Sequence, residues 1–380
     1  MQQRPNIAVL SYSGHKYSET FIQNQVRHLS GNVHYLYGGE LPTYYGQDVP
    51  FLKTDFVSRV KHSINRWLFN KTPYQQHLYA VEKYLVNNDV EVVLANYAIT
   101  AFPVMEICRR NNIPLIVHFH GWTAYRKSVL LKYKEQYSEL FKTATKIIAV
   151  SFDMKQQLQA LGAPAEKICV LRCGADENLF DYNAGERKSN VFFCPGRFCE
   201  TKNPQLTIRA FYQALKQLPD AKLVMGGGDE GLLQTCLDLV KELGIEDKVA
   251  FKGVLSHQQV AELMQTSTAL VIHSATTADG EKEGTPVTVL EAALSGLPIV
   301  ATKHAGIAEV FEHEISALLS DEFDIEQMAA NMVRVVKERE LGPKLAGKAY
   351  DVIKANYTLQ HYSKQLNELM ATVVKQKAGE

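Results

Sequence analysis

The sequence predicts an α/β protein built from two Rossmann-like, doubly wound domains that face each other across a cleft. Short β-rich runs alternate with helix-length amphipathic segments along the whole chain. Strands that alternate with helices of this length are typical of parallel sheets. The series of strands and helices occurs twice, and 380 residues are enough for two domains of ordinary size.

In the first half, five strands are expected at Asn6–Tyr12, Val33–Tyr37, Val92–Asn96, Pro114–His118 and Lys146–Val150. Helices are expected between them at Glu19–Leu29, Tyr74–Val86, Pro103–Asn111 and Asp153–Leu161.

The second half repeats this order, with strands at Val191–Cys194, Lys222–Met225, Val249–Phe251, Ala269–His273 and Pro298–Ala301. Three of its helices have start signals. Asn203-Pro204 and Thr285-Pro286 each pair a capping residue with a proline at the first helical position. Ser256 with Gln259 is a capping box.

The join between the domains is expected in the polar stretch Asp181–Ser189. We therefore predict a first domain over residues 1–184 and a second over 185–358. An amphipathic helix follows at about 359–380, with apolar residues at Tyr362, Leu366, Leu369 and Val373.

The charge is balanced overall but divided between the halves. The whole chain carries 41 basic and 41 acidic side chains. Residues 1–184 have a net charge of +5 and residues 185–380 a net charge of −5. The zero total argues against a general polyanion binder, so no nucleic-acid partner is expected.

The six cysteines show neither a Cys-x-x-Cys nor a zinc-ligand spacing, so buried free thiols are expected. The first apolar run, Ile7–Leu10, is too short for a signal peptide, and no stretch approaches the length of a membrane span. We expect a cytoplasmic protein, or one that rests on the inner face of a membrane.

The densest cluster of candidate functional residues runs from Glu281 to Pro298. A loop of small residues leads into a helix, and the free amides near Gly284, Thr285, Pro286 and Val287 form an anion-binding end, suited to a phosphate or a polar sugar. Glu283 precedes this helix and Glu291 lies inside it among apolar neighbours. Carboxylates in such positions suit sugar and ribose hydroxyls.

A second cluster, Pro195-Gly-Arg-Phe-Cys-Glu-Thr-Lys-Asn-Pro204, follows the first strand of the second half. Arg197 and Lys202 lie there ahead of a helix and suit a diphosphate, which they would stabilise as it leaves. Gly196 belongs to the same turn. Gly226–Gly228 end the next strand and allow close backbone approach to a ligand, although a plain tight turn would look the same.

In the first half, Gly14 lies in a loop that feeds the first helix, a placement that suits a phosphate. His118 and His120 end a later strand, and strand alternation sends them to the same face. No third ligand is readable, so a structural His118 and a substrate-contacting His120 are preferred to a metal site.

Together these residues resemble family 4 retaining glycosyltransferases, also called glycosyltransferase group 1. The resemblance rests on Glu283-x7-Glu291, the following Ala292–Pro298, Thr302–Glu309 with its Gly-x-x-Glu, Arg197 with Lys202, and Gly226–Glu230. In the first half it rests on Ser18–Phe21 and His118–Gly121. Lys303-His304-Ala305 departs from the pattern, because small residues often stand there.

The resemblance implies the GT-B fold, with the last helix crossing back to the first domain, and a nucleotide-diphosphate sugar as donor. Arg197 and Lys202 would bind the diphosphate, Glu291 the ribose, and Glu283 with the Gly284–Val287 backbone the donor sugar. His120 and Gly14 would reach the donor from the first domain. The implied reaction is transfer of a hexose with retention, by front-face attack, so Glu283 is not assigned as a nucleophile.

No Asp-x-Asp triplet occurs in the chain, which favours leaving-group stabilisation without a metal or other cofactor. Two alternatives stay open: an epimerase or phosphorylase on the same architecture, and a non-catalytic sugar-nucleotide binding protein.

Residues 53–71 hold five Lys/Arg and one Asp, with Phe56, Val60, Ile64 and Trp67 on one helical stripe. Such a helix could lie on an anionic membrane surface or pack on the core with its cations solvated. With the basic first half, it favours a glycan or lipid-linked acceptor, as in bacterial surface polysaccharide or glycolipid synthesis.

Overall fold

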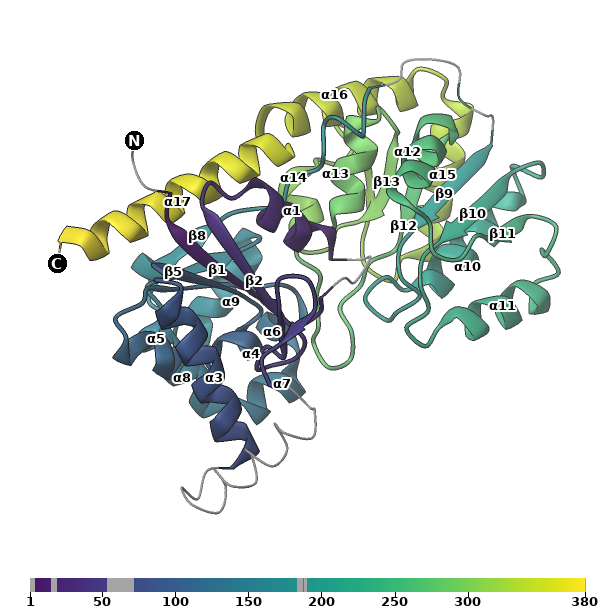
Figure 1. The fold of residues 1–380 in the computed structure, drawn as a ribbon. Coiled ribbons are helices and arrows are strands. Elements are labelled where there is room, and N and C mark those ends of the chain that lie inside the picture. Colours follow the sequence, from purple (N-terminus) through teal and green to yellow (C-terminus); the bar gives the residue numbers. More distant parts are fainter. Residues whose placement is uncertain (1–3, 15–18, 53–71, 183–186, 188–189, 380) are drawn as a thin grey trace.

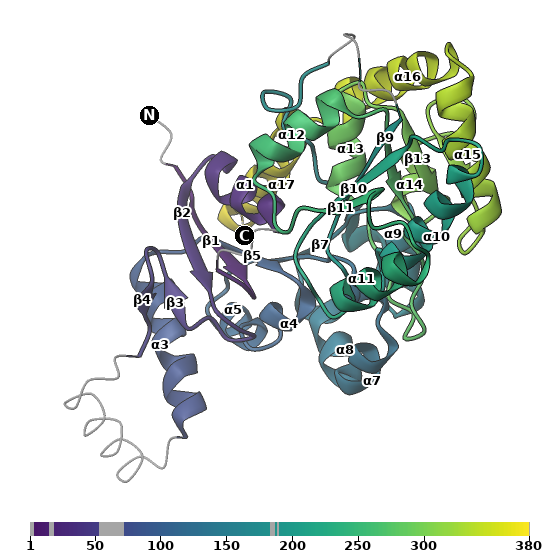
Figure 2. The ribbon, with the colours of Figure 1, turned by 90° about the vertical axis from the view of Figure 1, so that its right-hand side faces the viewer.

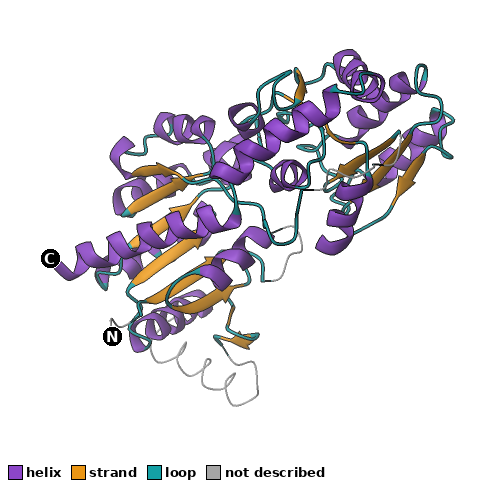
Figure 3. Ribbon diagram, turned by 90° about the horizontal axis from the view of Figure 1, so that it is seen from above, coloured by secondary structure: helices purple, strands orange, loops and turns teal. Residues whose placement is uncertain are grey.

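Two largely parallel sheets, each with helices packed on it, make up the two halves of the chain (Figures 1 and 3). The structure is a computed structural model, and it describes residues 4–14, 19–52, 72–182, 187 and 190–379. The predicted boundary between residues 184 and 185 and the basic segment 53–71 lie outside the described residues.

The first sheet has the strand order β4-β3-β2-β1-β5-β6-β7-β8. Its strands are β1 (Asn6–Ser11), β2 (Asn32–Tyr37), β3 (Tyr44–Tyr45), β4 (Val49–Pro50), β5 (Val92–Asn96), β6 (Leu115–His118), β7 (Lys146–Ala149) and β8 (Ile168–Val170). All pairs are parallel except those made by the short β3 and β4.

The helices of this half are α1 (Thr20–His28), α3 (Pro73–Asn87), α4 (Ala98–Ala101), α5 (Met105–Arg110), α6 (Trp122–Tyr125), α7 (Lys127–Lys132), α8 (Lys134–Thr143) and α9 (Phe152–Ala160), with a 3-10 turn at Ala165–Lys167.

The second sheet is fully parallel, with the order β11-β10-β9-β12-β13-β14. Its strands are β9 (Val191–Pro195), β10 (Lys222–Gly226), β11 (Val249–Phe251), β12 (Ala269–Ile272), β13 (Ile299–Thr302) and β14 (Leu318–Ser320). Its helices are α10 (Pro204–Leu215), α11 (Leu233–Glu242), α12 (His257–Thr266), α13 (Val287–Leu294), α14 (Gly306–Val310), α15 (Ile325–Lys337) and α16 (Leu341–Asn356).

The strand order reverses beside β1 in the first sheet and beside β9 in the second. Ligands of open parallel sheets bind outside the carboxyl ends of the strands at such switch points. The two domains lie side by side in Figure 1, and the second partly covers the first when seen from its own side (Figure 2), so the loops that follow β1 and β9 can contribute to one site.

The predicted strands and helices agree with the structure to within about two residues, and two of the three predicted helix starts are correct. Ser256 and Gln259 form the expected capping box. Asn203 is the N-cap residue of α10 and Pro204 its first residue, as predicted, but Asn203 adopts a left-handed conformation (φ 42°, ψ 54°) and its side chain makes no capping hydrogen bond. α13 begins one residue later than expected, so Pro286, not Thr285, is its N-cap residue.

The last helix, α17 (Leu359–Gly379), lies on the first domain, as predicted (Figure 1). The apolar side of α17 is buried in the core of that domain. It includes Tyr362, Leu366, Met370 and Val373. The helix thereby covers part of the first sheet after the chain has completed the second domain.

Two chain segments cross between the domains side by side. Ala175 and Thr358 form a parallel β-bridge. Ala175 N donates to Tyr357 O at 3.0 Å, and Leu359 N donates to Ala175 O at 2.7 Å. A β-carbon on Gly174 would lie 2.2 Å from the Thr358 carbonyl oxygen, so this close approach requires glycine.

None of the described helices has the length and apolar character needed to cross a lipid bilayer. All six cysteines are free, and five are buried, whereas Cys169 is partly exposed.

Candidate active site in the interdomain cleft

A cavity of about 880 Å³ lies between the domains, lined by residues that follow strands of both sheets. Ten of the twelve predicted site residues line it: His120, Gly196, Arg197, Lys202, Glu283, Gly284, Thr285, Pro286, Val287 and Glu291. The structure therefore brings together side chains that lie up to 171 positions apart in the sequence, between His120 and Glu291.

Gly14 and Gly228 are not among the residues that line the cavity. A β-carbon on Gly14 would lie 2.6 Å from the Tyr37 ring, so Gly14 permits close packing within the first domain. The carbonyl of Gly228 accepts a 2.9 Å hydrogen bond from Phe198 N and joins two loops of the second domain.

Lys202 and Glu283 form an ion pair in the cleft. Lys202 lies just before α10, and its Nζ is 2.8 Å from Glu283 Oε2. Their side chains are only 12% and 11% exposed. Burial alone would raise the pKa of Glu283, but the cations of Lys202 and Arg197 hold it below its ordinary value. Glu283 is therefore an anion held by Lys202 and by a 3.2 Å hydrogen bond from Ser274 Oγ.

Arg197 pairs with Glu230 across the loops that follow β9 and β10. The turn that carries Arg197 is tight, because a β-carbon on Gly227 would lie 1.8 Å from the carbonyl oxygen of Gly196. The two loops thus pack backbone to backbone and hold the guanidinium at the cavity wall, where Lys202 provides a second cation.

The loop before α13 is held against the first domain at Gly284, where a β-carbon would lie 2.3 Å from the Val150 side chain. The first amides of a helix have no acceptor within the helix, and α13 has no side-chain cap. The hydroxyls of Thr285 and Thr288 are buried without a partner among the described residues, and both residues line the cavity. The amides at the start of α13, unpaired within the described part of the chain, leave hydrogen-bonding capacity for a ligand.

Glu291 lies inside α13 and is 9% exposed. Burial raises its pKa to about 7, while Lys202 opposes the shift and Asp176 adds to it. Glu291 therefore changes protonation near neutral pH, unlike Glu283.

His304 holds the backbone of the Glu283 loop. Glu283 N donates to His304 Nε2 at 3.1 Å, and His304 Nδ1 donates to Glu322 Oε1 at 2.6 Å. Glu322 also accepts from Thr276 N at 2.8 Å. Hydrogen bonds from His304 and Thr276 lower the pKa of Glu322 to about 2, although burial alone would raise it. Sequence reasoning noticed His304 only as a departure from the family pattern and did not predict this role.

On the first-domain side, His120 follows β6 and packs against the rings of Phe21 and Tyr97. His120 Nε2 is 3.0 Å from Asn96 Oδ1. Burial, with a smaller effect of the neighbouring His118, lowers the pKa of His120 well below its ordinary value, so the ring is neutral. Asn96 was expected only as the end of a strand, and its position at a carboxyl end was the signal for a role in the site.

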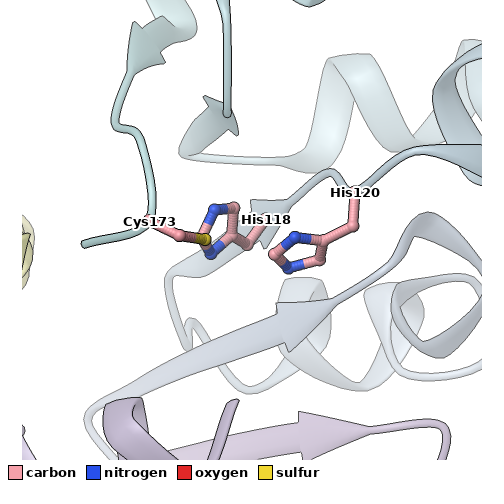
Figure 4. A group of neighbouring side chains, drawn as sticks. All are labelled: His118, His120 and Cys173. Atoms are coloured by element: carbon pink, nitrogen blue, oxygen red, sulfur yellow. The ribbon is translucent and has the colours of Figure 1, made fainter. Parts of the chain in front are cut away.

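His118, His120 and Cys173 lie close together below this wall (Figure 4). Their possible ligand atoms are within 4.8 Å of one another, and all three residues are buried. The sequence indicated the two histidines but not Cys173, because Cys173 follows β8 in a distant part of the chain.

The loop 279–282 of the second domain reaches over to the first domain. Arg126 Nε donates to Glu281 Oε2 at 3.0 Å, and Ser128 N donates to Asp279 Oδ1 at 3.0 Å. A third bridge joins Lys282 Nζ to Asp153 Oδ1 at 3.1 Å. These contacts hold the two walls of the cleft together.

Glu309, the acidic residue of the Gly-x-x-Glu motif, also bridges the domains. Its carboxylate accepts from the backbone of Phe152 at 2.8 Å and of Asp153 at 2.7 Å, at the N-terminus of α9. It also pairs with Arg172. Glu309 therefore helps to hold the second domain against the first.

Comparison with known families matches almost the whole chain. Residues 18–179 match the model described as glycosyltransferase family 4, and residues 176–352 match the model described as glycosyl transferases group 1. The chain belongs to the family 4 glycosyltransferases. Both the order of the motifs and the two-domain architecture of this family are present.

Curated relatives of this family 4 glycosyltransferase include bacterial polysaccharide enzymes. It is 31% identical over 222 residues to the amylovoran biosynthesis glycosyltransferase AmsK of Erwinia amylovora, which covers 57% of this chain and 54% of the relative. It is 28% identical over 258 residues to the putative colanic acid biosynthesis glycosyltransferase WcaL of Escherichia coli K12, covering 66% and 63%. The chain thus spans somewhat over half the length of these relatives.

Solved structures confirm the GT-B fold. Anabaena Alr3699/HepE in complex with UDP and glucose superposes with a TM-score of 0.74 at 17% identity, covering 97% of this chain and 100% of the other. Sucrose-phosphate synthase from Thermosynechococcus elongatus gives 0.77 at 17% identity, covering 98% and 100%. At such identities the likeness establishes the fold.

Proposed function

We propose that this protein transfers a hexose from a nucleotide-diphosphate sugar to an acceptor hydroxyl, with retention at the anomeric carbon, in the assembly of a bacterial surface polysaccharide or glycolipid. The observation that carries this proposal is the pairing of two cations, Arg197 and Lys202, with the uncapped start of α13 around one interdomain cavity.

The proposed binding of the donor is supported by the positive charges in the cavity and by polar groups that have no partner among the residues that the structure describes. Arg197 and Lys202 would bind the diphosphate, and the unpaired amides at the start of α13 would donate hydrogen bonds to the donor. Glu291 would accept hydrogen bonds from the ribose hydroxyls. The structural neighbour with bound UDP and glucose has the same fold, which agrees with a nucleotide-sugar donor.

The chemistry follows from electrostatics and positioning. As the bond from the anomeric carbon to the diphosphate breaks, negative charge grows on the leaving oxygen. Lys202 and Arg197, fixed in a largely buried site, stabilise that charge. The acceptor oxygen attacks from the face of the leaving group, and the departing phosphate takes the acceptor proton.

Glu283 has another part in this proposal. Its carboxylate is engaged by Lys202 and Ser274, and its pKa is lowered, so it is suited to accept hydrogen bonds from sugar hydroxyls. A covalent nucleophile would instead need to stand free beside the anomeric carbon. We therefore assign Glu283 to sugar binding.

The acceptor is proposed to be a glycan or a lipid-linked glycan, because the relatives act in amylovoran and, putatively, colanic acid synthesis. A cytoplasmic location and contact of residues 53–71 with an anionic membrane are parts of this proposal that binding to liposomes of phosphatidylglycerol would test. No metal is included, since Arg197 and Lys202 supply positive charge at the diphosphate.

The decisive experiment is a thermal-shift screen of UDP- and GDP-hexoses, followed by measurement of nucleotide diphosphate release with and without glycan acceptors. Release that increases with an acceptor, and an NMR spectrum of the product showing the donor's anomeric configuration, would support the proposal. Addition of EDTA should leave the rate unchanged.

The same experiment separates the alternatives. Binding without release would indicate a sugar-nucleotide binding protein, and conversion of the donor to its epimer would indicate an epimerase. Release that needs only inorganic phosphate would indicate a phosphorylase. Any of these results would overturn the transferase proposal.

A further inference from the structure

Beneath the first-domain wall of the cleft lies a connected set of buried polar side chains whose hydrogen-bond network the proposed function does not explain. It consists of Gln25 from α1, Asn96 at the end of β5, His118, His120, and Tyr362 from α17. Each is at most 8% exposed. Because buried polar groups are costly unless their donors face acceptors, the directions of these hydrogen bonds are constrained.

A backbone carbonyl fixes the first member of the network. Asn96 Nδ2 lies 3.2 Å from Leu10 O and 2.8 Å from Gln25 Oε1. A carbonyl can only accept, so the NH2 group of Asn96 must face Leu10, and its Oδ1 must face His120. His120 Nε2, 3.0 Å from that oxygen, therefore carries the proton.

The same logic fixes His118. Since Gln25 Oε1 accepts from Asn96, Gln25 Nε2 is the group that lies 2.9 Å from His118 Nδ1 and 2.7 Å from Tyr362 Oη. An amide NH2 can only donate, so His118 Nδ1 is an acceptor and Nε2 carries the proton. His118 Nε2 is buried without a partner among the described residues.

This arrangement argues against a metal ion held by His118, His120 and Cys173 (Figure 4). A metal at His118 Nε2 would move the proton to Nδ1, where it would face the NH2 group of Gln25. Turning Gln25 over would then oppose its NH2 group to that of Asn96. Only two of the three groups could act as ligands, which is too few for a stable zinc site.

We infer that Asn96 is a positioning residue that locks His120 in the Nε2–H form, so that Nδ1 is presented as an acceptor to a hydroxyl of the donor sugar. The carbonyl of Leu10 fixes the orientation of Asn96. Gln25 accepts a second hydrogen bond from Asn96 and in turn donates to Tyr362 of the last helix. The inference rests on the proposed function for its ligand, whereas the protonation pattern of the histidines follows from the network alone.

The first test is NMR of the protein with 15N-labelled histidine, with His120→Gln and His118→Gln used to assign the signals. Between pH 6 and 8, His120 and His118 should both show a protonated Nε2 and an unprotonated Nδ1. A protonated Nδ1 on His120, or a doubly protonated ring at pH 7, would overturn the inference.

The second test compares Asn96→Ala with Thr100→Val. Thr100 is equally buried and donates only to backbone carbonyls, including that of Asn96, so its variant controls for a local packing defect. Asn96→Ala should mix the two neutral forms of His120 and weaken binding of the sugar nucleotide about 3- to 10-fold. Affinity for the nucleoside diphosphate, which lacks the sugar, should stay within 2-fold.

Equal loss of affinity for the nucleoside diphosphate and the sugar nucleotide in Asn96→Ala would mean a merely structural role and would count against the inference. Loss of sugar-nucleotide affinity in Thr100→Val equal to that in Asn96→Ala would also count against the inference. If no sugar nucleotide binds the unmodified protein, the proposed function fails, while the NMR result still decides the histidine forms.

A titration with ZnCl2 alone addresses the metal alternative. One equivalent should leave the His118 and His120 signals in place. Stoichiometric shifts of both rings that Cys173→Ala abolishes would show a metal site and overturn the network argument.

Discussion

Lys202 and Glu283 form an ion pair in the cleft, with Nζ and Oε2 2.8 Å apart and both side chains about nine-tenths buried. A diphosphate that binds near Lys202 competes with this carboxylate for the ammonium. In the proposed reaction the cation would therefore be desolvated and oriented before the donor binds, which is the preorganisation that electrostatic catalysis requires.

Replacement of Lys202 by Ala should reduce kcat for transfer at least about 100-fold, because charge that develops on the leaving group loses a fixed cation. Circular dichroism should show an intact fold. Lys303→Ala is a matched control, since Lys303 makes an exposed ion pair with Asp321 in the same domain. Near-normal transfer by Lys202→Ala would refute the assignment of Lys202 to the diphosphate.

Glu283→Gln should lower the free energy of unfolding by about 1–2 kcal/mol at pH 7, because it leaves the Lys202 ammonium without its anion in a largely buried site. Chemical denaturation measures this. The pKa of Glu283 is lowered, so its stabilising contribution is present above the ordinary carboxyl pKa and is lost as the pH falls below it. The destabilisation by Glu283→Gln should therefore shrink towards pH 3.

The pKa of about 7 for Glu291 predicts a pH dependence of donor binding. Ribose hydroxyls donate to the ionised form, so affinity should rise from pH 6 to pH 8 and level off above the pKa. Glu291→Gln should bind the donor more weakly, with little pH dependence. Calorimetric titration at three pH values measures the donor affinity. The prediction is contradicted if the affinity of Glu291→Gln changes with pH as steeply as that of the unmodified protein.

Glu291 should also lower the free energy of unfolding at high pH. The folded protein holds the Glu291 proton more tightly than the unfolded chain does, so its contribution to stability falls as the pH rises from about 4.5 to 7. Glu291→Gln removes that decrease and should raise the free energy of unfolding at pH 8 by at most about 3 kcal/mol. Lower stability of this variant at pH 8 would argue against a buried, ionising Glu291.

His304→Ala should weaken binding of the sugar nucleotide about 10-fold, because the Glu283 loop loses the acceptor for its backbone amide. His313→Ala is the matched control: His313 Nδ1 likewise accepts a backbone amide, that of Leu319 at 2.9 Å. His313→Ala should lower the free energy of unfolding but leave the donor affinity unchanged. Equal binding losses in the two variants would show that the effect of His304 is not local to the site.

Arg126→Glu should reduce kcat/KM a few-fold by separating the 279–282 loop from the first domain, and the exchange Arg126→Glu with Glu281→Arg should restore it. The effect is small because Arg126 is 43% exposed and its ion pair is screened by solvent. Steady-state kinetics at low and high salt measure it. Failure of the exchanged pair to recover activity would indicate that Arg126 acts on substrate directly.

The fold and the second-domain half of the site could be predicted because their signals are local. The alternation of strand-length and helix-length segments predicts the two sheets. Glu283 and Glu291 lie in one loop and the helix that follows it, so their spacing places both at one cleft. Thr285 was wrongly predicted as a cap because its residue type permits capping, whereas α13 begins after Pro286 and the Thr285 hydroxyl is buried against Gly306.

Contacts over long sequence distances could not be predicted. Asn96 reaches His120 across two neighbouring strands, and Tyr362 reaches Gln25 from 337 positions away. Neither pair has a spacing that a motif could encode. The orientation of His304 depends on Glu322 in another loop, for the same reason.

The paired crossing at Ala175 and Thr358 makes the second domain an insertion into the first. A nascent chain can complete the second domain as a continuous segment, but the first waits for α17 to emerge before Tyr362 and Leu366 fill its core. During synthesis, the second domain is thus finished first. The wall that carries His120 matures last, when Tyr362 reaches Gln25.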